Sequence, residues 1–400
     1  MKFLVNKNVS MKTFITAITI AVVCAVMITI ITFQFFGMIF GVSNQNDYID
    51  KLQEIERLVE KDFIGEIDQI ELKDAIADGY TKGLGDKYAL YTSASEAEKR
   101  LENVSGINYG IGITFIKHPQ SENLYITNVS TDSPADKGGI KKGDEITKID
   151  EMVIANTENT EILSYISGLP LETEVSVELL RSGETVTTTL LTEKFEQQTV
   201  FCEIVDNILY IEIVKFNDYT FEQFKKAFDD NFNENIKGIV YDLRNNTGGT
   251  LNAVDKVLDY ILPKGNMFYI EYKGENNTAY FDSDEQCIDC PMVVLTNGKT
   301  ASAAELFTGV LKDYKYAISI GETTYGKGVA QKTYTLSDGS LVKFTIAKYY
   351  TASGSCVDKV GIKPDVEVKQ TSDEITESYL SGIATDRLFK AAAEHFAKQN

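Results

Sequence analysis

Between Phe14 and Phe40 the chain is almost wholly apolar and carries no charged residue. About 20 apolar residues suffice for a helix to cross a bilayer, so this run predicts a transmembrane anchor over residues 13–40. Lysines precede the run and acidic residues follow it, which predicts that residues 1–12 lie in the cytoplasm and the rest outside. A cleaved signal peptide, the alternative, has a shorter apolar region and a small-residue cleavage site.

The pattern over residues 45–103 predicts a helical segment. In its first helix one apolar face is formed at helical spacing by Ile49, Leu52, Ile55, Leu58 and Val59. A second helix, expected within ELKDAIADGYTKGL, ends at glycines. These amphipathic helices either pack against their own domain or pair with a second copy of the chain as a homodimer.

Over residues 104–193 the pattern changes to short strands separated by turns. Strands are expected in YGIGITFI, NLYITNVS, DEITKIDEMVI, EVSVELLRS and TVTTTLLTE, and helices in SPADKGGI and NTEILSYISGL. Five or six strands and two helices in so short a span predict a small β-rich module with half-buried sheets.

Residues 194–400 alternate apolar strands, bounded by glycines, with amphipathic helices. Strands are expected in ILYIEIVKF, IKGIVYDL, PMVVLTN, YAISIGE and LVKFTIAKYY, and helices in FEQFKKAFDDNF, LNAVDKVLDYIL, SAAELFTGVLKDY and DRLFKAAAEHFAK. Such alternation predicts a sheet covered by helices. The fold class expected is a multidomain α/β (α+β) chain: a transmembrane helix, a helical segment, a β-rich module and an α/β core.

Charge and composition narrow the chemistry. The net charge of -20 argues against nucleic-acid binding, because phosphates would be repelled. The only two histidines are His118, in an expected hairpin, and His395, near the C-terminus, and neither lies in a motif. A Ser-His-Asp triad or a histidine-rich zinc site would need one of them. Cys287 and Cys290 form a lone CxxC, which favours a local disulfide or two free thiols over a metal site.

Ser302 follows an expected strand and turn and opens an expected helix, in VVLTNGKTASAAELFTGVLKDY. Nucleophiles are often placed at such points, where the helix N-terminus offers unpaired N–H groups and positive potential. The amide of Ala303 could then stabilise an oxyanion. The spacing of Ser302 and Glu305 also fits a simple capping box, in which the serine has no chemical role.

Lys327 lies between two glycines after a buried strand, in YAISIGETTYGKGVAQ. Burial disfavours the charged amine and lowers its pKa, as a general base near neutral pH requires. A neutral Lys327 could deprotonate Ser302, and Gln331 could orient the amine. Lys299 is an alternative base, but it lies in a polar turn where desolvation is hard to arrange.

The same stretch also begins like a phosphate-binding loop, because Gly321 to Lys327 reads G-x-x-x-x-G-K. That motif continues with a serine or threonine for magnesium and then a helix. Here Gly328 follows, and VAQKTYTL predicts a strand. The nucleotide-binding interpretation is therefore disfavoured.

A third element, VYDLRNNTGGTLNAVDKVLDYIL, runs from a strand through a Gly-Gly turn into a helix. Gly248 and Gly249 could bring a second N–H group toward an oxyanion, or the turn is an ordinary strand–helix connection. Asp242 and Arg244, just before the turn, are expected to form a structural pair.

Taken together, these segments resemble the carboxyl-terminal processing peptidases, also called tail-specific proteases. The resemblance covers residues 50 to 368 and rests on GIGITF, DSPADKGGIKKGDEITKID, YDLRNNTGGTL, TNGKTASAAELFTGVLKD, IGETTYGKGVAQ, DGSLVKFTIAKYYTASG and VGIKPDVEV, in the family's order. Each segment is weakly specific alone, whereas the ordered set is highly specific.

The resemblance implies a nucleophile at Ser302, a general base at Lys327 and an orienting residue at Gln331. It places the oxyanion hole on Ala303 and on either Gly248 or Gly249. Residues 104–193 are similar to the family's PDZ domain. Their loop Gly110, Ile111, Gly112 and Ile113 would receive the substrate's terminal carboxylate, and the peptide would add as a strand to the sheet edge. In such proteases this module can also gate activity.

Three positions depart from the family's usual pattern. The nucleophile is followed by Ala-Ala-Glu where Ala-Ser-Glu is usual, and Thr247 stands where proline is common. Ser167 and Gly168 stand where many relatives have Arg-Gly. The last change puts in doubt any gating contact made through an arginine, and leaves the chemistry unaffected.

The function expected is that of an extracytoplasmic serine endopeptidase at the cell membrane, anchored by one helix. Its partners would be protein or peptide substrates with accessible C-termini, and it would need no metal and no cofactor. The alternative is a membrane-anchored PDZ receptor or scaffold that binds tails without cutting them.

Overall fold

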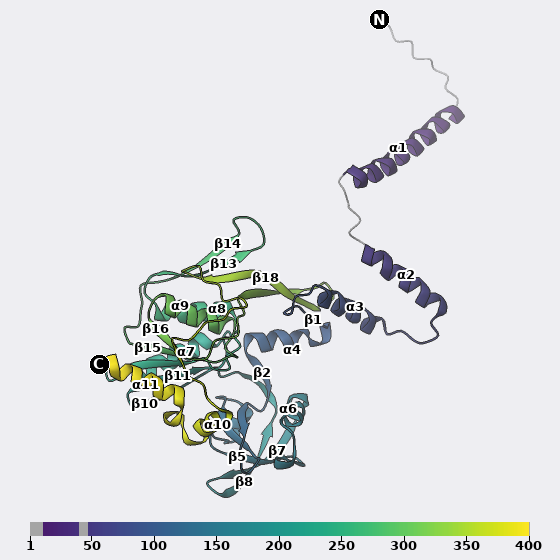
Figure 1. Ribbon diagram of the computed structural model, residues 1–400. Helices are drawn as coiled ribbons and strands as arrows, with labels where there is room; N and C mark the ends of the chain where they lie inside the picture. The colour runs from purple at the N-terminus through teal and green to yellow at the C-terminus, as the bar shows by residue number, and fades with distance from the viewer. Residues whose placement is uncertain (1–10, 40–46, 400) are drawn as a thin grey trace. The chain divides into compact units, whose positions relative to one another are not determined.

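The computed structural model describes residues 11–39 and 47–399, in two units divided between Leu72 and Lys73 (Figure 1). The first unit holds two long helices, and a third begins before the division. These are α1 (Met11–Ile39), α2 (Asp47–Asp62) and α3 (Gln69–Gly83). The helix predicted from the apolar face between Ile49 and Leu58 is therefore confirmed, as α2.

The anchor predicted over residues 13–40 coincides with α1, except for residue 40, which lies outside the described residues. The helix is confirmed. By length and apolarity together, however, no helix in the described ranges qualifies to cross a bilayer, so the predicted span is unsupported. The prediction for residues 1–12 falls almost entirely outside the described part of the chain.

A six-stranded sheet forms the centre of the second unit. Its spatial order is β10 (Val200–Val205), β11 (Ile208–Ile213), β12 (Gly238–Asp242), β15 (Met292–Thr296), β16 (Ala317–Gly321) and β19 (Val366–Glu367). All neighbours after β11 are parallel, and β10 is antiparallel to β11. Parallel sheets need cover on both faces, and this sheet has it.

Alternate residues of each strand face different helices. Leu209, Tyr241 and Val294 pack with three helices on one face: α7 (Thr220–Asn231), α8 (Leu251–Ile261) and α9 (Ala303–Asp313). Tyr210 and Val293 pack on the other face with α11 (Arg387–Gln399). The period of two in the strands thus divides the apolar residues between two cores.

A second sheet supplies one wall of the site described below. Its spatial order is β1 (Leu90–Thr92), β18 (Leu341–Thr351), β13 (Gly265–Tyr272) and β14 (Thr278–Ser283), and β17 (Val329–Thr335) also pairs with β18. Residues Ala94–Ser105 form α4, which ends at Gly106, where a positive φ of 107° closes the helix.

The β-rich module expected over residues 104–193 forms a sheet of its own. The strands are β3 (Ile113–Lys117), β4 (Leu124–Val129), β5 (Glu145–Ile149), β6 (Met152–Val153), β7 (Glu174–Arg181) and β8 (Glu184–Leu191). The helices are α5 (Pro134–Lys137) and α6 (Asn159–Gly168), as expected. A two-stranded ribbon of β2 (Ile107–Gly110) and β9 (Glu193–Glu196) joins the module to the core.

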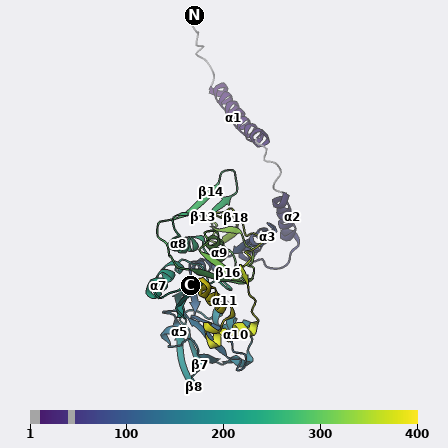
Figure 2. The ribbon, with the colours of Figure 1, turned by 60° about the vertical axis from the view of Figure 1, so that its left-hand side comes forward.

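The C-terminal segment lies against the core sheet and, through its first helix, beside this module. It contains α10 (Ser372–Ser381) and α11, drawn in yellow, and both views show α10 beside the module (Figures 1 and 2). Lys142 of the module and Tyr379 of α10 line one small cavity with core residues such as Glu212. The last segment of the chain therefore helps to hold the module against the core.

Candidate active site

Ser302 stands where β15 turns into α9, as the strand–turn–helix pattern predicts. Its backbone has φ 59° and ψ -121°, a conformation that L-residues rarely adopt. A simple N-cap residue has extended backbone angles, so capping alone does not explain this geometry. Strain held by the surrounding structure is typical of functional positions.

Glu305, on the first turn of α9, is completely buried and accepts four hydrogen bonds. The donors are the Ser302 amide at 2.9 Å, the Lys327 amide at 2.8 Å, the Gly326 amide at 2.7 Å and the Thr324 hydroxyl at 2.5 Å. One carboxylate therefore holds the segments of both Ser302 and Lys327. Sequence reasoning identified Glu305 only as part of a capping box.

Lys327 precedes β17, and its side chain is partly buried. Burial lowers the pKa of its ammonium group, and the nearby positive charge of Lys343 lowers it further, whereas Asp86 and Glu305 act in the opposite direction. The Lys327 Nζ lies 4.6 Å from the ring centroid of Tyr88. The hydrogen bonds of the described residues include none between Lys327 and Ser302.

Gln331 lies on β17, four residues after Lys327 in the sequence. Its Nε2 donates to the Val329 carbonyl at 3.2 Å and to the Thr345 hydroxyl at 3.3 Å. Both donor bonds fix the amide, so its Oε1 is the atom left to accept a bond from an amine. The residue therefore has the chemistry to orient Lys327.

Tyr349, on β18, is a site residue that sequence reasoning missed. Its hydroxyl donates to the Lys327 carbonyl. Burial raises the pKa of the Tyr349 phenol well above its usual range, while a hydrogen bond with Ser302 acts the other way. An aromatic residue in a strand 47 positions from the nucleophile carries no sequence signal that would link the two.

Ser302, Lys327 and Gln331 line one cavity of about 690 Å³. Gly248, Gly249 and Tyr349 line it too, although β12, β15, β17 and β18 are far apart in sequence. Lys299, the alternative base, is exposed and is absent from the lining. The structure thus brings the predicted nucleophile, base and orienting residue into a single cavity.

The two glycines of the turn after β12, Gly248 and Gly249, differ in the hydrogen bonding of their backbone amides. The Gly248 N–H donates to the Asn246 Oδ1 at 2.8 Å. A Cβ at Gly248 would come within 2.8 Å of the Ala303 nitrogen, so the turn lies directly against the helix N-terminus. Gly249 pairs with Phe216 as an isolated bridge. Asn246, which sequence reasoning missed, therefore distinguishes the two glycines.

In the β-rich module, the predicted peptide-binding residues run from the last residue of β2, Gly110, to the first residue of β3, Ile113. Gly110 and Gly112 have positive φ values of 126° and 84°. Ile111 is buried, and its carbonyl accepts from the Ala135 amide at 2.8 Å. Because β3 ends its sheet and pairs there only with β4, one of its edges has no neighbouring strand.

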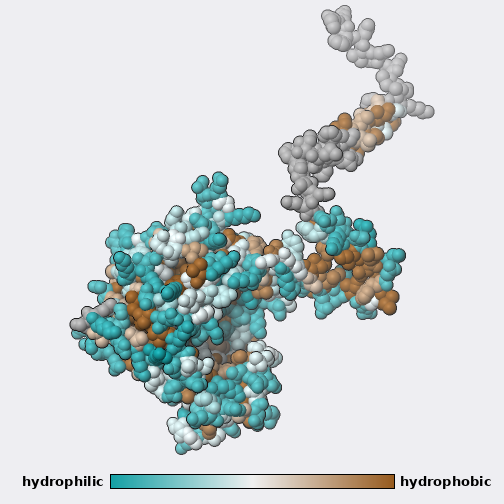
Figure 3. Space-filling view, in the orientation of Figure 1, coloured by the Kyte–Doolittle hydropathy of each residue, from teal (hydrophilic) through white to brown (hydrophobic). Residues whose placement is uncertain are grey.

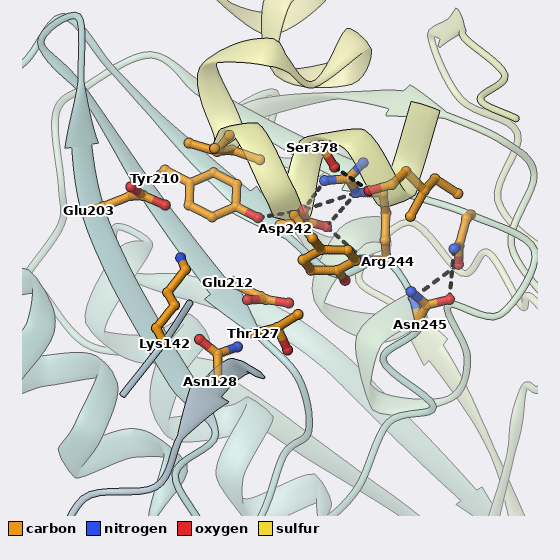
Figure 4. Close-up of a pocket in the computed structure, with 15 residues that line it drawn as sticks. Thr127, Asn128, Lys142, Glu203, Tyr210, Glu212, Asp242, Arg244, Asn245 and Ser378 are labelled. Atoms are coloured by element: carbon orange, nitrogen blue, oxygen red, sulfur yellow. Dashed lines mark hydrogen bonds and ion pairs between the residues drawn. The ribbon is translucent and has the colours of Figure 1, made fainter. Parts of the chain in front are cut away.

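A second cluster of charges lies between the module, the core and α10 (Figure 4). Asp242 accepts from Tyr210 at 2.7 Å and pairs with Arg244, which also contacts Asp386 at 2.8 Å. The structural pair predicted for Asp242 and Arg244 is confirmed. Glu212, beside it, has a pKa raised to about 7, chiefly by burial and by the charge of Asp242.

The five cysteines are free thiols, so Cys287 and Cys290 form no disulfide. The disulfide alternative for this pair is therefore not realised. In the described ranges, no cluster of three or more histidine, cysteine or carboxylate side chains is arranged to hold a metal ion.

Comparison with known proteins agrees with this architecture. The family model "Peptidase family S41" matches residues 207–368, and the "PDZ domain" model matches residues 110–192. A "Probable CtpA-like serine protease" of Staphylococcus aureus (strain COL) is 31% identical over 370 residues, which cover 91% of this chain and 74% of that protein.

A "Carboxy-terminal processing protease CtpA" of Bacillus subtilis (strain 168) is 31% identical over 365 residues, covering 90% of this chain and 77% of that protein. Among solved structures, a putative S41 protease from Bacteroides fragilis has the same fold, with a TM-score of 0.59 at 18% identity, covering 85% of this chain and 93% of its own. The chain therefore belongs to peptidase family S41, the carboxy-terminal processing serine peptidases, and carries a PDZ domain.

Proposed function

We propose that this peptidase cleaves proteins near their C-termini with Ser302 as nucleophile, Lys327 as general base and Gln331 as the residue that orients the base. The observation that carries the proposal is their convergence on one cavity, with Ser302 strained at the start of α9. The lowered pKa of Lys327 supports the role of base, because a neutral amine is needed to accept a proton.

In the reaction, the Lys327 side chain rotates from the Tyr88 ring to the Ser302 hydroxyl and accepts its proton. The Ser302 oxygen then attacks the scissile carbonyl and forms a tetrahedral intermediate. The protonated Lys327 gives its proton to the leaving amine, and an acyl-enzyme remains. Water, deprotonated by the same amine, releases the second product. The Gln331 Oε1 holds the amine on this path.

For the oxyanion hole we propose the amides of Ala303 and Gly249. Ala303 is the first residue of α9, where the amide has no acceptor within the helix. Gly248 is the less suitable second donor, because its amide already donates to Asn246. Two such donors stabilise the negative charge that develops on the carbonyl oxygen.

The PDZ domain would supply the substrate. A C-terminal peptide would add to the open edge of β3, and its terminal carboxylate would lie against the loop from Gly110 to Ile113. The support is the edge position of β3 and the tight, glycine-containing loop that precedes it.

The test is cleavage of a peptide with a free C-terminus, measured for the wild type, Ser302→Ala and Lys327→Ala. Both variants should lose cleavage and remain folded by circular dichroism, and Lys327→Arg should also be inactive because arginine does not deprotonate. Lys299→Ala, which changes the exposed lysine of the neighbouring turn, should cleave normally. Cleavage that survives in Ser302→Ala and Lys327→Ala would rule out this mechanism.

The rival function, a PDZ receptor that binds tails without cutting them, makes a distinct prediction. The wild type would bind the peptide without releasing products, and a fluorophosphonate would not label Ser302. The cavity around Ser302 and Lys327 favours the peptidase.

We also propose attachment to the cell membrane with the catalytic part outside the cytoplasm. The support is in the sequence: the uncharged run from Phe14 to Phe40, with lysines before it and acidic residues after it. Membrane fractionation of the full chain and of a chain lacking residues 1–45, together with protease accessibility in intact cells, tests this. Recovery of the full chain in the soluble fraction would contradict it.

A homodimer through the N-terminal helices is the remaining proposal. In α2, Ile49, Leu52, Ile55 and Leu58 are 36–55% exposed, and apolar residues gather over this helix (Figure 3). We expect Leu52→Asp with Leu58→Asp to shift the full chain in detergent from dimer to monomer by light scattering. An unchanged mass would contradict the proposal.

A further inference from the structure

The charges that line the active-site cavity are all of one sign. Four cationic residues belong to the lining, and no aspartate or glutamate does. The cations are Arg100, Lys215, Lys327 and Lys343. The chain as a whole has a net charge of -20, with 59 acidic and 39 basic residues. The composition alone would predict an acidic lining, whereas the charged residues that line this cavity are all basic.

The three cations other than Lys327 come from separate parts of the fold and still lie near one another. Arg100 is on α4, Lys215 follows β11, and Lys343 is on β18. Burial lowers the pKa of Lys215 and of Lys343, and the positive charge of Arg100 lowers each further. Both lysines are therefore close enough to Arg100 to be repelled by it.

Two acidic groups lie near the cavity without lining it, and each accepts hydrogen bonds from other donors. The negative charge of Asp86 acts to raise the pKa of Lys343 and of Lys327, and its carboxylate accepts from the amides of Tyr88 at 2.9 Å and Thr345 at 2.7 Å. Glu305 is occupied by its four donors, as described above. In the described part of the chain no ion pair within 4.0 Å involves Arg100, Lys215 or Lys343, and the Lys215 Nζ donates to the Asn103 carbonyl at 3.3 Å.

We infer that Arg100, Lys215 and Lys343 bind a carboxylate of the substrate beside the scissile bond, so that the peptidase selects acidic tails. The inference rests on the proposed catalytic function of the same cavity. Each of the three groups can donate hydrogen bonds to a carboxylate, and an anion among them would relieve their mutual repulsion. A cleft lined by one sign of charge also concentrates ligands of the opposite sign.

The carboxylate has two possible sources, an aspartate or glutamate side chain or the terminal carboxylate of a short tail. A peptide with a mapped cleavage site separates them. In one arm, each residue flanking the scissile bond is changed to Asp or to the isosteric Asn. In the other arm, the C-terminus is a free acid or an amide. The measurement is the ratio of kcat/KM for the charged and neutral forms.

We expect the charged form to be preferred roughly tenfold in at least one arm, and the preference to weaken as salt rises. Lys215→Gln and Lys343→Gln should each reduce the ratio several-fold, and Lys343→Arg should restore it. The arm in which the ratio falls identifies the source. Recognition of the terminus by the PDZ domain would not depend on Lys215 or Lys343.

Lys237→Gln is the matched control, because Lys237 is exposed and lies just before β12, outside the cavity lining. The ratio should be the same in this variant as in the wild type. Equal cleavage of all charged and neutral peptides by an enzyme that Ser302→Ala inactivates would overturn this inference alone. So would a preference that persists in both glutamine variants. Cleavage that survives Ser302→Ala would overturn it together with the proposed function.

Discussion

At the scale of single residues, Glu305 connects the segments of the proposed nucleophile and the proposed base. Its carboxylate accepts from the backbone of both Ser302 and Lys327, so displacement of one segment disturbs the other. A buried carboxylate is tolerated only when its oxygens are satisfied, and four donors satisfy this one. The strained φ of Ser302 is held in part by this bond.

Replacement of Glu305 should therefore cost both stability and activity. In Glu305→Gln the side-chain NH₂ would face N–H donors, and in Glu305→Ala all four donors would lose their acceptor. We expect the free energy of unfolding to fall by about 3–5 kcal/mol in either variant. Urea unfolding measures this loss. Peptide cleavage should fall even where the variant remains folded, and a fully active Glu305→Gln would contradict this role.

Lys343 should influence the pH dependence of catalysis through Lys327. Its positive charge contributes to the lowered pKa of the Lys327 ammonium, so Lys343→Met should raise that pKa. In the proposed mechanism the neutral amine is the active form, so the rising limb of kcat/KM should move to higher pH. The profile is measured with an uncharged peptide. Lys348→Met, on the same strand but outside the cavity lining, should leave the limb in place.

At the scale of elements, the turn between β12 and α8 positions the proposed oxyanion hole. Gly248 has φ 95°, and a Cβ there would lie 2.7 Å from the Ala301 oxygen and from the Ser302 Cβ. An alanine would therefore push this turn away from the start of α9. Misplacement of catalytic groups by about 1 Å costs on the order of a hundredfold in rate.

Gly248→Ala should lose activity on that scale. Gly183→Ala is the control, because Gly183 has a similar φ of 84° and nothing within 4 Å of the added methyl group. Both variants should be destabilised by about 1–3 kcal/mol from backbone strain. Only Gly248→Ala should be impaired in peptide cleavage, and equal loss in both would assign the effect to strain alone.

Elements with long apolar runs were predictable from the sequence. The runs of β11, β12, β15 and β16 lie in a parallel sheet buried on both faces, where most residues are apolar. The hairpin of β13 and β14 was missed, although FYIEY and TAYFDS alternate around a glycine-containing turn. Tyr88, Asn246 and Tyr349 were missed because tertiary packing alone brings such distant residues to Ser302.

At the scale of the whole molecule, the PDZ domain and the core meet at a cluster of polar and charged groups. Asn128 and Lys142 come from the PDZ domain, Glu212 from β11, and Tyr379 from α10. Burial and the charge of Asp242 raise the pKa of Glu212 to about 7, while Arg244, Lys142 and a hydrogen bond with Asn128 lower it. The pKa of Glu212 therefore depends on the contact between the PDZ domain and the core.

Stability should consequently depend on pH through Glu212. As pH rises from about 4.5 to about 7, the unfolded chain loses this proton and the folded chain keeps it, so the wild type loses stability in that window. Glu212→Gln cannot lose a proton there. Its free energy of unfolding, relative to the wild type, should rise by roughly 3 kcal/mol between pH 4.5 and 7, at about 1.4 kcal/mol per pKa unit.

Urea unfolding of both proteins at pH 5 and pH 8 measures this difference. Lys142→Met provides an independent test, because loss of the lysine charge should raise the pKa of Glu212 further and extend the window to higher pH. Since Lys142 belongs to the PDZ domain, this change in the pKa of Glu212 requires the PDZ domain to be in contact with the core. A difference between Glu212→Gln and the wild type that is the same at both pH values would show that Glu212 ionises alike in the folded and unfolded chains. The contact between the PDZ domain and the core would then not depend on the ionisation of Glu212.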